Sequence, residues 1–231
     1  MPDRPRKGGW TITASPATTS LTPKGRRTRA KILDAAKEVF SEYGYTAARM
    51  GDISSAADLS LGALYRYFTD KDELFAELFE DLHSQFLAAT RPAQAPKTSD
   101  ELRQSLRRAN ELYFTLYSEE RDFMRAVVEA SAVNQNYMDR WSAMYEEIAD
   151  RFLRRVQRVN TGFPTGAGLG SVIFALVCLT EQVAYVNFSR SAGKPRMSAT
   201  VLAELVTAIW WCSLEDGHVA ASTSHKARRR S

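Results

Sequence analysis

The side chains best suited to chemistry in this 231-residue chain are cations gathered near its two ends. Residues 1–31 hold eight Lys or Arg against a single Asp, and residues 218–231 hold four against no acid. The stretch between them holds 19 basic and 26 acidic residues. A polyanion such as nucleic acid would be attracted to the ends and repelled by the centre. Basic ends could equally serve solubility alone, so a docking element has to decide between the two interpretations.

Groups for catalysis or metal binding are sparse. The histidines lie far apart and only two cysteines are present: His83, His218, His225, Cys178 and Cys212. We find no Gly-rich phosphate loop, no nucleophile elbow and no metal-ligand spacing, so we expect no catalytic residue, metal or cofactor. Glu181 stands out because it interrupts the apolar stretch 174–188, where a carboxylate must find a partner or raise its pKa. It is either a structural carboxylate or a ligand-facing group.

Helical periodicity dominates the elements that must position these groups. Apolar residues recur every three or four positions from residue 25 onward, and Gly44 follows where a helix C-cap belongs. Asp70 with Glu73, and Thr98 with Glu101, have capping-box spacing and predict two helix starts. Strand patterns are missing. We expect an all-α fold of about nine helices near 25–43, 49–57, 60–68, 70–88, 98–117, 120–134, 135–160, 171–190 and 198–215.

The cellular location can be estimated from what the sequence lacks. Its longest apolar run, residues 172–179, is shorter than the roughly 18 residues of a membrane helix. The N-terminus has no apolar stretch of the kind found in a secretory signal. Together with the scarcity of cysteine, these features favour a cytoplasmic protein without a membrane partner.

Residues 49–68 have the pattern of a helix-turn-helix. Two short helices are joined by a tight turn, and their apolar residues are expected to face each other: Ile53, Ala56, Ala57, Leu59 and Leu64. Small residues, Gly62 and Ala63 among them, should allow close approach of the two backbones. The second helix, from Ser60 to Phe68, would then enter the DNA major groove.

The same residues resemble the DNA-binding domain of the TetR family of bacterial transcriptional regulators. The similarity extends over about 50 residues, and it is carried by Asp52-Ile53, Ala56-Ala57, Ser60-Leu61-Gly62-Ala63-Leu64-Tyr65-Arg66-Tyr67-Phe68 and Lys71-Asp72-Glu73-Leu74. It implies an all-helical homodimer, typically a repressor that a small molecule releases from its operator. The alternatives are an activator or a ligand-independent DNA binder of the same family.

The resemblance also implies which residues contact DNA. Residues of the recognition helix are expected at bases or phosphates, together with cations around them: Arg49, Leu61, Gly62, Ala63, Tyr65, Arg66, Tyr67, Lys71, Arg26, Arg27 and Arg29. Arg66 could read guanine or grip a phosphate. Tyr65 and Tyr67 are DNA contacts or core aromatics, whereas Leu64 and Phe68 are expected in the core. Two positions depart from the family pattern: Ala48 stands where Thr is usual, and Asp58 stands where Gly is usual at the turn.

The acidic C-terminal part is rich in aromatic residues and is expected to leave an apolar cavity between helices. It resembles a TetR subgroup typified by the mycobacterial regulator of ethionamide activation, through Trp141-Ser142, Leu179-Thr180-Glu181, Tyr185, Phe188, Val201-Leu202, Leu205-Val206 and Ile209-Trp210. This similarity implies a long apolar tunnel lined by Phe114, Tyr145, Ile148, Phe152, Val177, Thr180, Glu181, Tyr185 and Trp210. Subgroup asparagines are replaced here by Val177 and Thr180, so the ligand should differ.

The last two helices carry more apolar surface than one subunit needs, which favours a homodimer and a palindromic operator. The residues expected on this face are Val172, Ile173, Leu176, Val183, Val186, Leu202, Leu205, Val206 and Ile209. We therefore expect a disordered basic arm (1–23), a DNA-binding domain (24–71), a ligand-binding and dimerisation domain (72–217) and a disordered basic tail (218–231). An enzyme in the C-terminal bundle and a non-specific DNA binder are the rival hypotheses.

Overall fold

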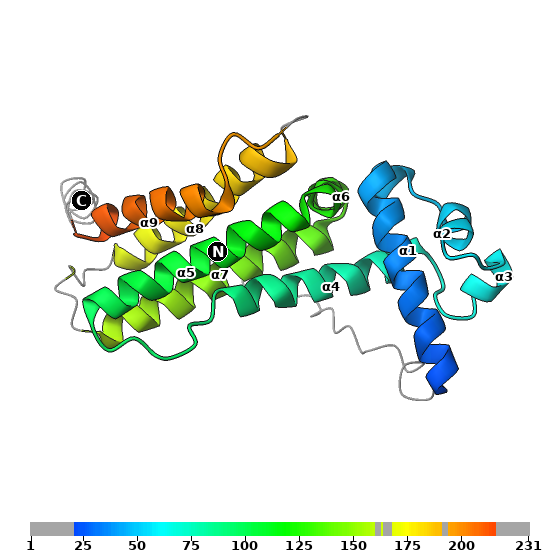
Figure 1. Cartoon of the computed structure of the whole chain (residues 1–231), viewed down its shortest axis with the longest axis horizontal. Coiled ribbons are helices and arrows are strands. Elements are labelled where there is room, and N and C mark those ends of the chain that lie inside the picture. Colours follow the sequence, from blue (N-terminus) through cyan, green and yellow to red (C-terminus); the bar gives the residue numbers. More distant parts are fainter. Residues whose placement is uncertain (1–20, 160–162, 164–167, 191–193, 216–231) are drawn as a thin grey trace, which may run out of the picture.

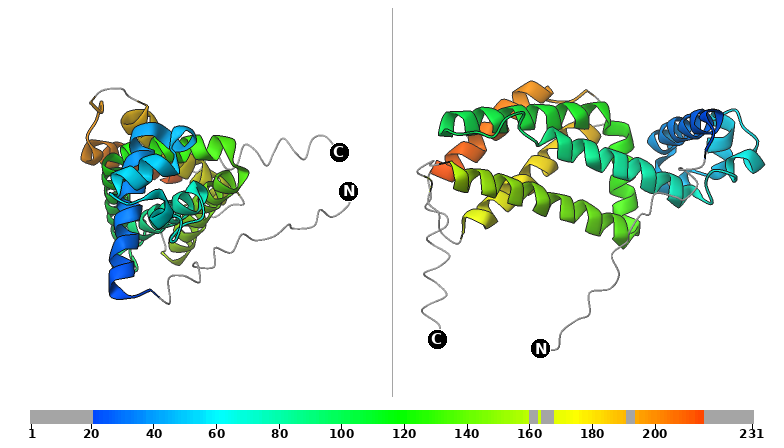
Figure 2. Two further views of the ribbon diagram at one scale, coloured as in Figure 1. Left: turned by 90° about the vertical axis from the view of Figure 1, so that its right-hand side faces the viewer. Right: turned by 90° about the horizontal axis from the view of Figure 1, so that it is seen from below.

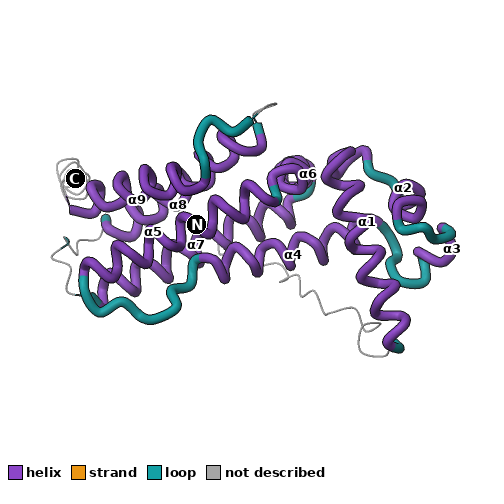
Figure 3. The backbone as a smooth tube through the Cα atoms, in the orientation of Figure 1, coloured by secondary structure: helices purple, strands orange, loops and turns teal. Residues whose placement is uncertain are grey.

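The structure, a computed structural model, describes residues 21–159, 163, 168–190 and 194–215, and this part of the chain is helical without strands (Figures 1 and 3). The all-α expectation is therefore confirmed. The elements are α1 (Pro23–Ala47), α2 (Met50–Ala56), α3 (Leu61–Leu64), α4 (Lys71–Ala89), α5 (Ser99–Glu119), α6 (Arg121–Val133), α7 (Gln135–Arg158), α8 (Leu169–Ala184), the π-helical turn η2 (Tyr185–Ser189) and α9 (Ala199–Glu215). The expected arm up to residue 20 and the tail 218–231 lie outside the described residues.

Helix α1 begins and bends where the sequence predicts. The Thr22 hydroxyl accepts a hydrogen bond from the Gly25 amide at 3.2 Å, and Pro23 occupies the first turn, where its missing N–H costs nothing. At the other end Gly44 adopts φ 80°, a left-handed conformation that favours glycine. The helical path breaks there, and one short turn follows before the chain enters α2.

The turn between α2 and α3 contains Asp58 at φ 51°, so this aspartate holds the conformation that the usual glycine would supply. The Ser60 side chain then caps α3 by accepting from the Ala63 amide at 3.2 Å. The α-helix proper covers four residues and not the nine expected. The chain nevertheless continues in helical turns to Phe68, whose amide donates to the Leu64 carbonyl at 3.2 Å.

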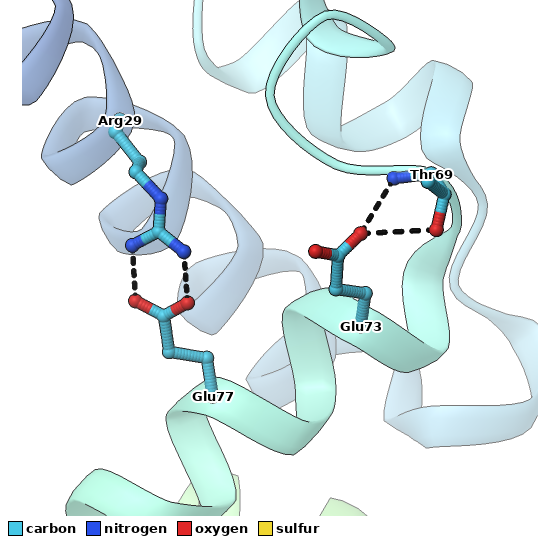
Figure 4. Close-up of polar contacts among 4 residues, drawn as sticks. All are labelled: Arg29, Thr69, Glu73 and Glu77. Atoms are coloured by element: carbon cyan, nitrogen blue, oxygen red, sulfur yellow. Dashed lines mark hydrogen bonds and ion pairs between the residues drawn. The ribbon is translucent and has the colours of Figure 1, made fainter. Parts of the chain in front are cut away.

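Helix α4 connects the N-terminal helices to the bundle (Figure 1). Asp70 accepts from the Glu73 amide at 2.8 Å, while the Glu73 carboxylate accepts from the Thr69 amide at 2.7 Å (Figure 4), which confirms the predicted helix start. The buried face of α4 is aromatic, and its rings contact Tyr137 and Trp141 of α7. Each such fully buried ring contributes roughly 1.5–3 kcal/mol to folding.

The C-terminal bundle is built by α5, α7, α8 and α9, with α5 packed on α9 and α7 on α8. Helix α6 stands across the end of the bundle and packs against α1 (Figure 2, right). The segment Leu169–Ser189 is long and apolar enough to cross a membrane by length and composition, with a mean hydropathy of 1.7. This segment was not identified from the sequence, because only uninterrupted runs of apolar residues were considered. It packs against α5, α7 and α9 and carries the buried Glu181.

Candidate nucleic-acid interface and ligand cavity

The segment from α3 to Phe68 has one buried and one solvent-facing side. Leu64 and Phe68 are fully buried, which confirms their expected place in the core. On the opposite side Leu61 and Tyr65 are 43% and 49% exposed, and Arg66 is also exposed. Large apolar and aromatic side chains left in solvent at helical spacing are typical of a surface that contacts another molecule. The exposed side combines them with a cation, which suits DNA.

Gly62 lies on the same exposed side. A Cβ atom placed on Gly62 would meet no atom within 4 Å, so nothing inside the protein requires glycine there. The expectation that Gly62 permits close approach of the two backbones is therefore wrong, and so is the inward orientation expected for Ala56, which is exposed. The contact between α2 and α3 is made by the buried side chains of Ile53, Ala57 and Leu64.

The remaining recognition-helix positions are less open. Ala63 and Tyr67 are half-buried, so each can present only part of its side chain to a ligand. Arg49 is exposed at the N-cap of α2, where its carbonyl accepts from the Asp52 amide at 3.0 Å. The exposed Asp58 carries a negative charge beside this surface, partly balanced by Lys31 at 3.9 Å.

Lys71 has a role inside the domain. Its Nζ donates to the carbonyl oxygens of Tyr45, Thr46 and Ala48 at 2.8, 3.0 and 3.3 Å, and it lies 5.0 Å from the centre of the Tyr45 ring. Three carbonyls use all three donors of an ammonium group. Lys71 therefore closes the chain between α1 and α2, and a phosphate contact would have to replace one of these bonds.

Arg29 corrects a sequence-based expectation. Its guanidinium pairs with both carboxylate oxygens of Glu77 in α4 (Figure 4) and lies 4.6 Å from the centre of the Phe68 ring. The residue is buried and clamps α1 to α4, so its guanidinium is not exposed as a phosphate contact would require. Arg26 and Arg27 are exposed, and Arg26 donates to the Leu21 carbonyl at 2.8 Å. Only these two cations of the predicted trio remain available to a phosphate.

A further contact, which sequence reasoning missed, joins α6 to the end of α1. The Glu129 carboxylate accepts from the backbone amides of Tyr45 and Thr46 at 2.9 and 3.1 Å. A Cβ atom on Gly44 would collide with this carboxylate, so Gly44 is needed for both its conformation and its space. The only signal in the sequence was Gly44 itself, because a single glutamate among 27 acidic residues carries no pattern.

The bundle contains a small apolar cavity of about 40 Å³. Its walls come from α5, α7, α8 and α9, with Thr90 at the C-cap of α4. They are Thr90, Leu106, Ala109, Asn110, Tyr113, Tyr145, Ile148, Phe152, Arg155, Val177, Thr180 and Trp210. Six of the nine expected ligand residues line it: Tyr145, Ile148, Phe152, Val177, Thr180 and Trp210.

The other three expected ligand residues lie outside the cavity wall. Phe114 is fully buried and packs on Tyr113 and Phe188, while Tyr185 is half-buried in η2. Glu181 is buried, with one carboxylate oxygen 3.5 Å from the Tyr117 hydroxyl and the other without a hydrogen-bond partner. Desolvation raises the pKa of Glu181 to about 7, against the opposing effect of nearby hydrogen-bond donors, Tyr117 among them.

Two polar side chains of the cavity wall, Thr180 and Asn110, are already hydrogen-bonded within the protein. The Thr180 hydroxyl donates to the Leu176 carbonyl at 2.8 Å and accepts from the Trp210 indole at 3.0 Å. Asn110 donates to the Thr207 hydroxyl at 2.9 Å. Thr180 is therefore a structural link between α8 and α9, and the cavity offers a ligand mainly apolar surface.

An apolar stripe runs along the outer side of α8, η2 and α9. Its exposed members on α9, Val201, Leu205 and Ile209, are four residues apart, and Phe174, Leu179 and Val186 are exposed on α8 and η2. Of the nine residues expected on a dimer face, Val186, Leu205 and Ile209 are exposed, and Val172 and Val183 are half-buried. The other four, Ile173, Leu176, Leu202 and Val206, are buried within the subunit. The expectation that these four residues lie on the dimer face is wrong, because they occupy core positions.

Comparison with known proteins finds similarity that is concentrated in the N-terminal part of the chain. Residues 32–78 match the family of bacterial regulatory proteins described as the tetR family. The transcriptional activator FasR of Mycolicibacterium smegmatis is 33% identical over 113 residues, 49% of this chain and 50% of FasR. The transcriptional repressor Rv1474c of Mycobacterium tuberculosis is 41% identical over 64 residues, 27% of this chain and 34% of that protein. The chain thus spans half or less of the length of these relatives.

The fold also has a solved counterpart over most of the chain. A TetR-like transcriptional regulator from Rhodococcus sp. RHA1 superposes with a TM-score of 0.62 at 24% identity, over 83% of this chain and 96% of that one. At this identity the likeness shows the fold alone. Among the described residues, no group of three or more His, Cys, Asp or Glu side chains is arranged to hold a metal ion.

Proposed function

From the premise that residues 32–78 form a DNA-binding helix-turn-helix domain of the tetR family, we propose that the whole chain is a ligand-responsive transcriptional regulator. In this proposal it binds a palindromic operator as a homodimer in the cytoplasm, and a small, largely apolar molecule releases it. The observation that carries the proposal is the exposed side of α3, with Leu61, Tyr65 and Arg66 in solvent opposite a fully buried Leu64.

The contacts that we propose with DNA follow from this exposure. Tyr65, Arg66 and the open backbone at Gly62 would face the major groove, and Arg26, Arg27 and Arg49 would contact flanking phosphates. Arg66 would contribute roughly 1–3 kcal/mol of discrimination if it reads a guanine edge, and only affinity if it meets a phosphate.

The apolar stripe on α8 and α9 supports the homodimer. Exposed apolar side chains at helical spacing need a partner surface, and a two-fold axis through the stripe would pair each helix with its copy. Two α3 segments related by that axis would meet successive major grooves, which is why a palindromic operator is proposed.

The proposed switch begins in the narrow cavity. Because the cavity is small, an apolar ligand would push helices of the bundle apart. Two elements would carry this displacement toward α1: the connecting helix α4 through the Arg29–Glu77 clamp, and α6 through Glu129. A ligand would shift the equilibrium between two settings only by its differential affinity for them.

The proposal also has to choose between repression and activation of transcription. FasR is named an activator and Rv1474c a repressor, so the relatives include both. We propose repression as the simpler case, because a dimer on an operator blocks transcription without any further contact. The resemblance to the ethionamide-regulator subgroup stays a prediction. A rival enzyme function would be tested by turnover of any bound ligand, and non-specific DNA binding by random duplexes.

The test is a gel shift and footprint on the DNA upstream of the gene, with purified full-length protein at moderate salt. Tyr65→Ala with Arg66→Ala should weaken binding at least tenfold relative to wild type, while the exposed but distant Arg107→Ala should leave it unchanged. A wild-type protein that ignores duplex DNA, or a double variant that binds as well as wild type, would refute the proposal.

A further inference from the structure

The apolar cavity has a single charged residue in its wall. Arg155, in the last turn of α7, lines it beside Thr90, and the guanidinium Nη2 donates to the Thr90 carbonyl at 3.0 Å. Within the part of the chain that the structure describes, no carboxylate lies within ion-pair distance of Arg155. A half-buried guanidinium with one neutral partner keeps several N–H donors and its full positive charge available to bind an anion.

More cations line two hollows that each share a residue, Arg155 or Ala109, with the cavity. Arg155 and Arg158 line a neighbouring hollow under Pro92, Ala95 and Pro96 of the segment between α4 and α5. A third hollow shares those three residues and adds the cations Arg91, Lys97 and Arg108, with Glu101 as its acid. The Glu101 carboxylate is engaged by the Lys97 amide at 2.7 Å. We call this side of the cavity, where Arg155 adjoins the two hollows, its mouth, and its charge is strongly basic.

Ordinary structural reasons explain only part of this arrangement. Cations in the last turn of a helix favour the helix dipole, which accounts for the exposed Arg158. Arg155 differs, because placing its charged group against apolar walls costs desolvation free energy. Desolvation, together with the nearby Arg151 and Arg154, lowers its pKa, and no acid compensates. An anion at the mouth would supply the missing charge.

We propose that the cavity binds an amphiphilic anion, with its apolar chain between α5, α7, α8 and α9 and its carboxylate or phosphate head on Arg155 and Arg158. The small cavity favours an unbranched chain, because such a chain requires the least separation of the helices. The inference rests on the ligand site of the proposed function and adds the chemical class of the ligand. A cation is disfavoured because Glu181, the buried carboxylate nearby, does not line the cavity.

The head group can be tested with compounds that share one chain. Isothermal titration of the full chain with decanoate, decyl phosphate, decanol and decyltrimethylammonium, all below their micelle concentrations, compares carboxylate, phosphate, neutral and cationic heads. We expect both anions, or one of them, to bind at least tenfold more tightly than decanol, and the cation not to bind. The stronger anion identifies the head-group source. Equal affinity for decanol, preference for the cation, or no binding of any compound would overturn the proposal.

Variants of the arginines at the mouth test whether the anionic head group binds there. Arg155→Gln should weaken the anions at least tenfold and leave decanol unchanged, whereas the exposed neighbour Arg154→Gln should leave both unchanged. Arg155→Lys keeps the charge and should retain part of the affinity, which separates charge loss from misfolding. Ala109→Phe should block every decyl chain by filling the cavity. Equal effects of Arg155→Gln and Arg154→Gln would refute the assignment. These measurements use no DNA, so a protein that fails the gel shift can still pass them.

Discussion

At the scale of single residues, Gly62 separates folding from DNA binding. Its surroundings inside the protein are empty, and glycine in a helix costs roughly 0.5–1 kcal/mol relative to alanine. Gly62→Leu should therefore leave the unfolding free energy unchanged or raise it by up to about 1 kcal/mol, yet lower operator affinity at least tenfold, because the added side chain would occupy the space proposed for DNA.

Urea unfolding and gel shifts measure the two effects separately. Ala132→Leu adds similar bulk to an exposed position of α6 and serves as the control, with both quantities expected to stay near wild type. If Gly62→Leu binds the operator normally, α3 does not lie against the bases and the proposed interface is wrong.

Glu181 predicts a pH dependence of stability. Its pKa is about 7 in the folded protein, above the ordinary value near 4.5, so the folded state holds the proton more tightly than the unfolded state. The sign follows: stability is fully present below about pH 4.5 and is lost as pH rises through about 7. Glu181→Gln should thus stabilise the protein by up to about 3 kcal/mol at pH 8 and have little effect at pH 5.

Unfolding midpoints at pH 5 and pH 8 check this prediction. Glu111→Gln, a half-buried glutamate of α5 paired with Arg107, is the control and should show no such rise. A destabilised Glu181→Gln at pH 8 would mean that the carboxylate is needed in its charged form.

At the scale of elements, α6 offers a second route between the bundle and α1, beside α4. Glu129→Ala would remove the acceptor for the Tyr45 and Thr46 amides. We expect it to lower the unfolding free energy by about 1 kcal/mol. It should also weaken the effect of the ligand on operator binding at least threefold, while operator affinity without ligand changes less.

Titrating the operator complex with ligand measures this coupling. Glu119→Ala, an exposed acid at the end of α5, should leave it unchanged. If Glu129→Ala responds to ligand as wild type does, the signal travels through α4 alone.

The helices were predictable from the sequence because caps and periodicity are local signals. Thr98 caps α5 and Asp70 caps α4 as expected, since both bonds join residues three positions apart. The errors concern residues whose surroundings come from distant elements. Arg29 pairs with Glu77, 48 positions away, and nothing in its own sequence context distinguishes it from Arg26 and Arg27.

The cavity shows the same limit. Six of its residues were expected, because they share the inner side of helices whose periodicity is clear. Arg155 was missed because the position of the α4–α5 segment, which places Thr90 beside it, depends on packing and not on a motif. A small error in the predicted rotation of α2 about its axis was enough to place Ala56 in the core, although the residue is exposed.

At the scale of the whole molecule, the exposed stripe predicts the oligomeric state. Leu205→Arg would place a charge in the middle of the proposed dimer face, where Leu205 is 48% exposed. It should convert the dimer to a monomer in sedimentation velocity and lower operator affinity at least tenfold. Val133→Arg, at an even more exposed position of α6, should remain dimeric. A wild-type monomer that still binds a palindrome would contradict the prediction.

The segment between α4 and α5, which lines the hollows beside Arg155, and α3 lie at opposite ends of the molecule (Figure 1). An effector can therefore reach a copy that is still seated on its operator, without waiting for spontaneous departure. The residence time of the complex should then shorten as effector concentration rises, which stopped-flow competition would record. A residence time independent of effector would mean that only unbound copies are captured. The first outcome would allow a faster cellular response, because effector could act on operator-bound protein before that protein dissociates by itself.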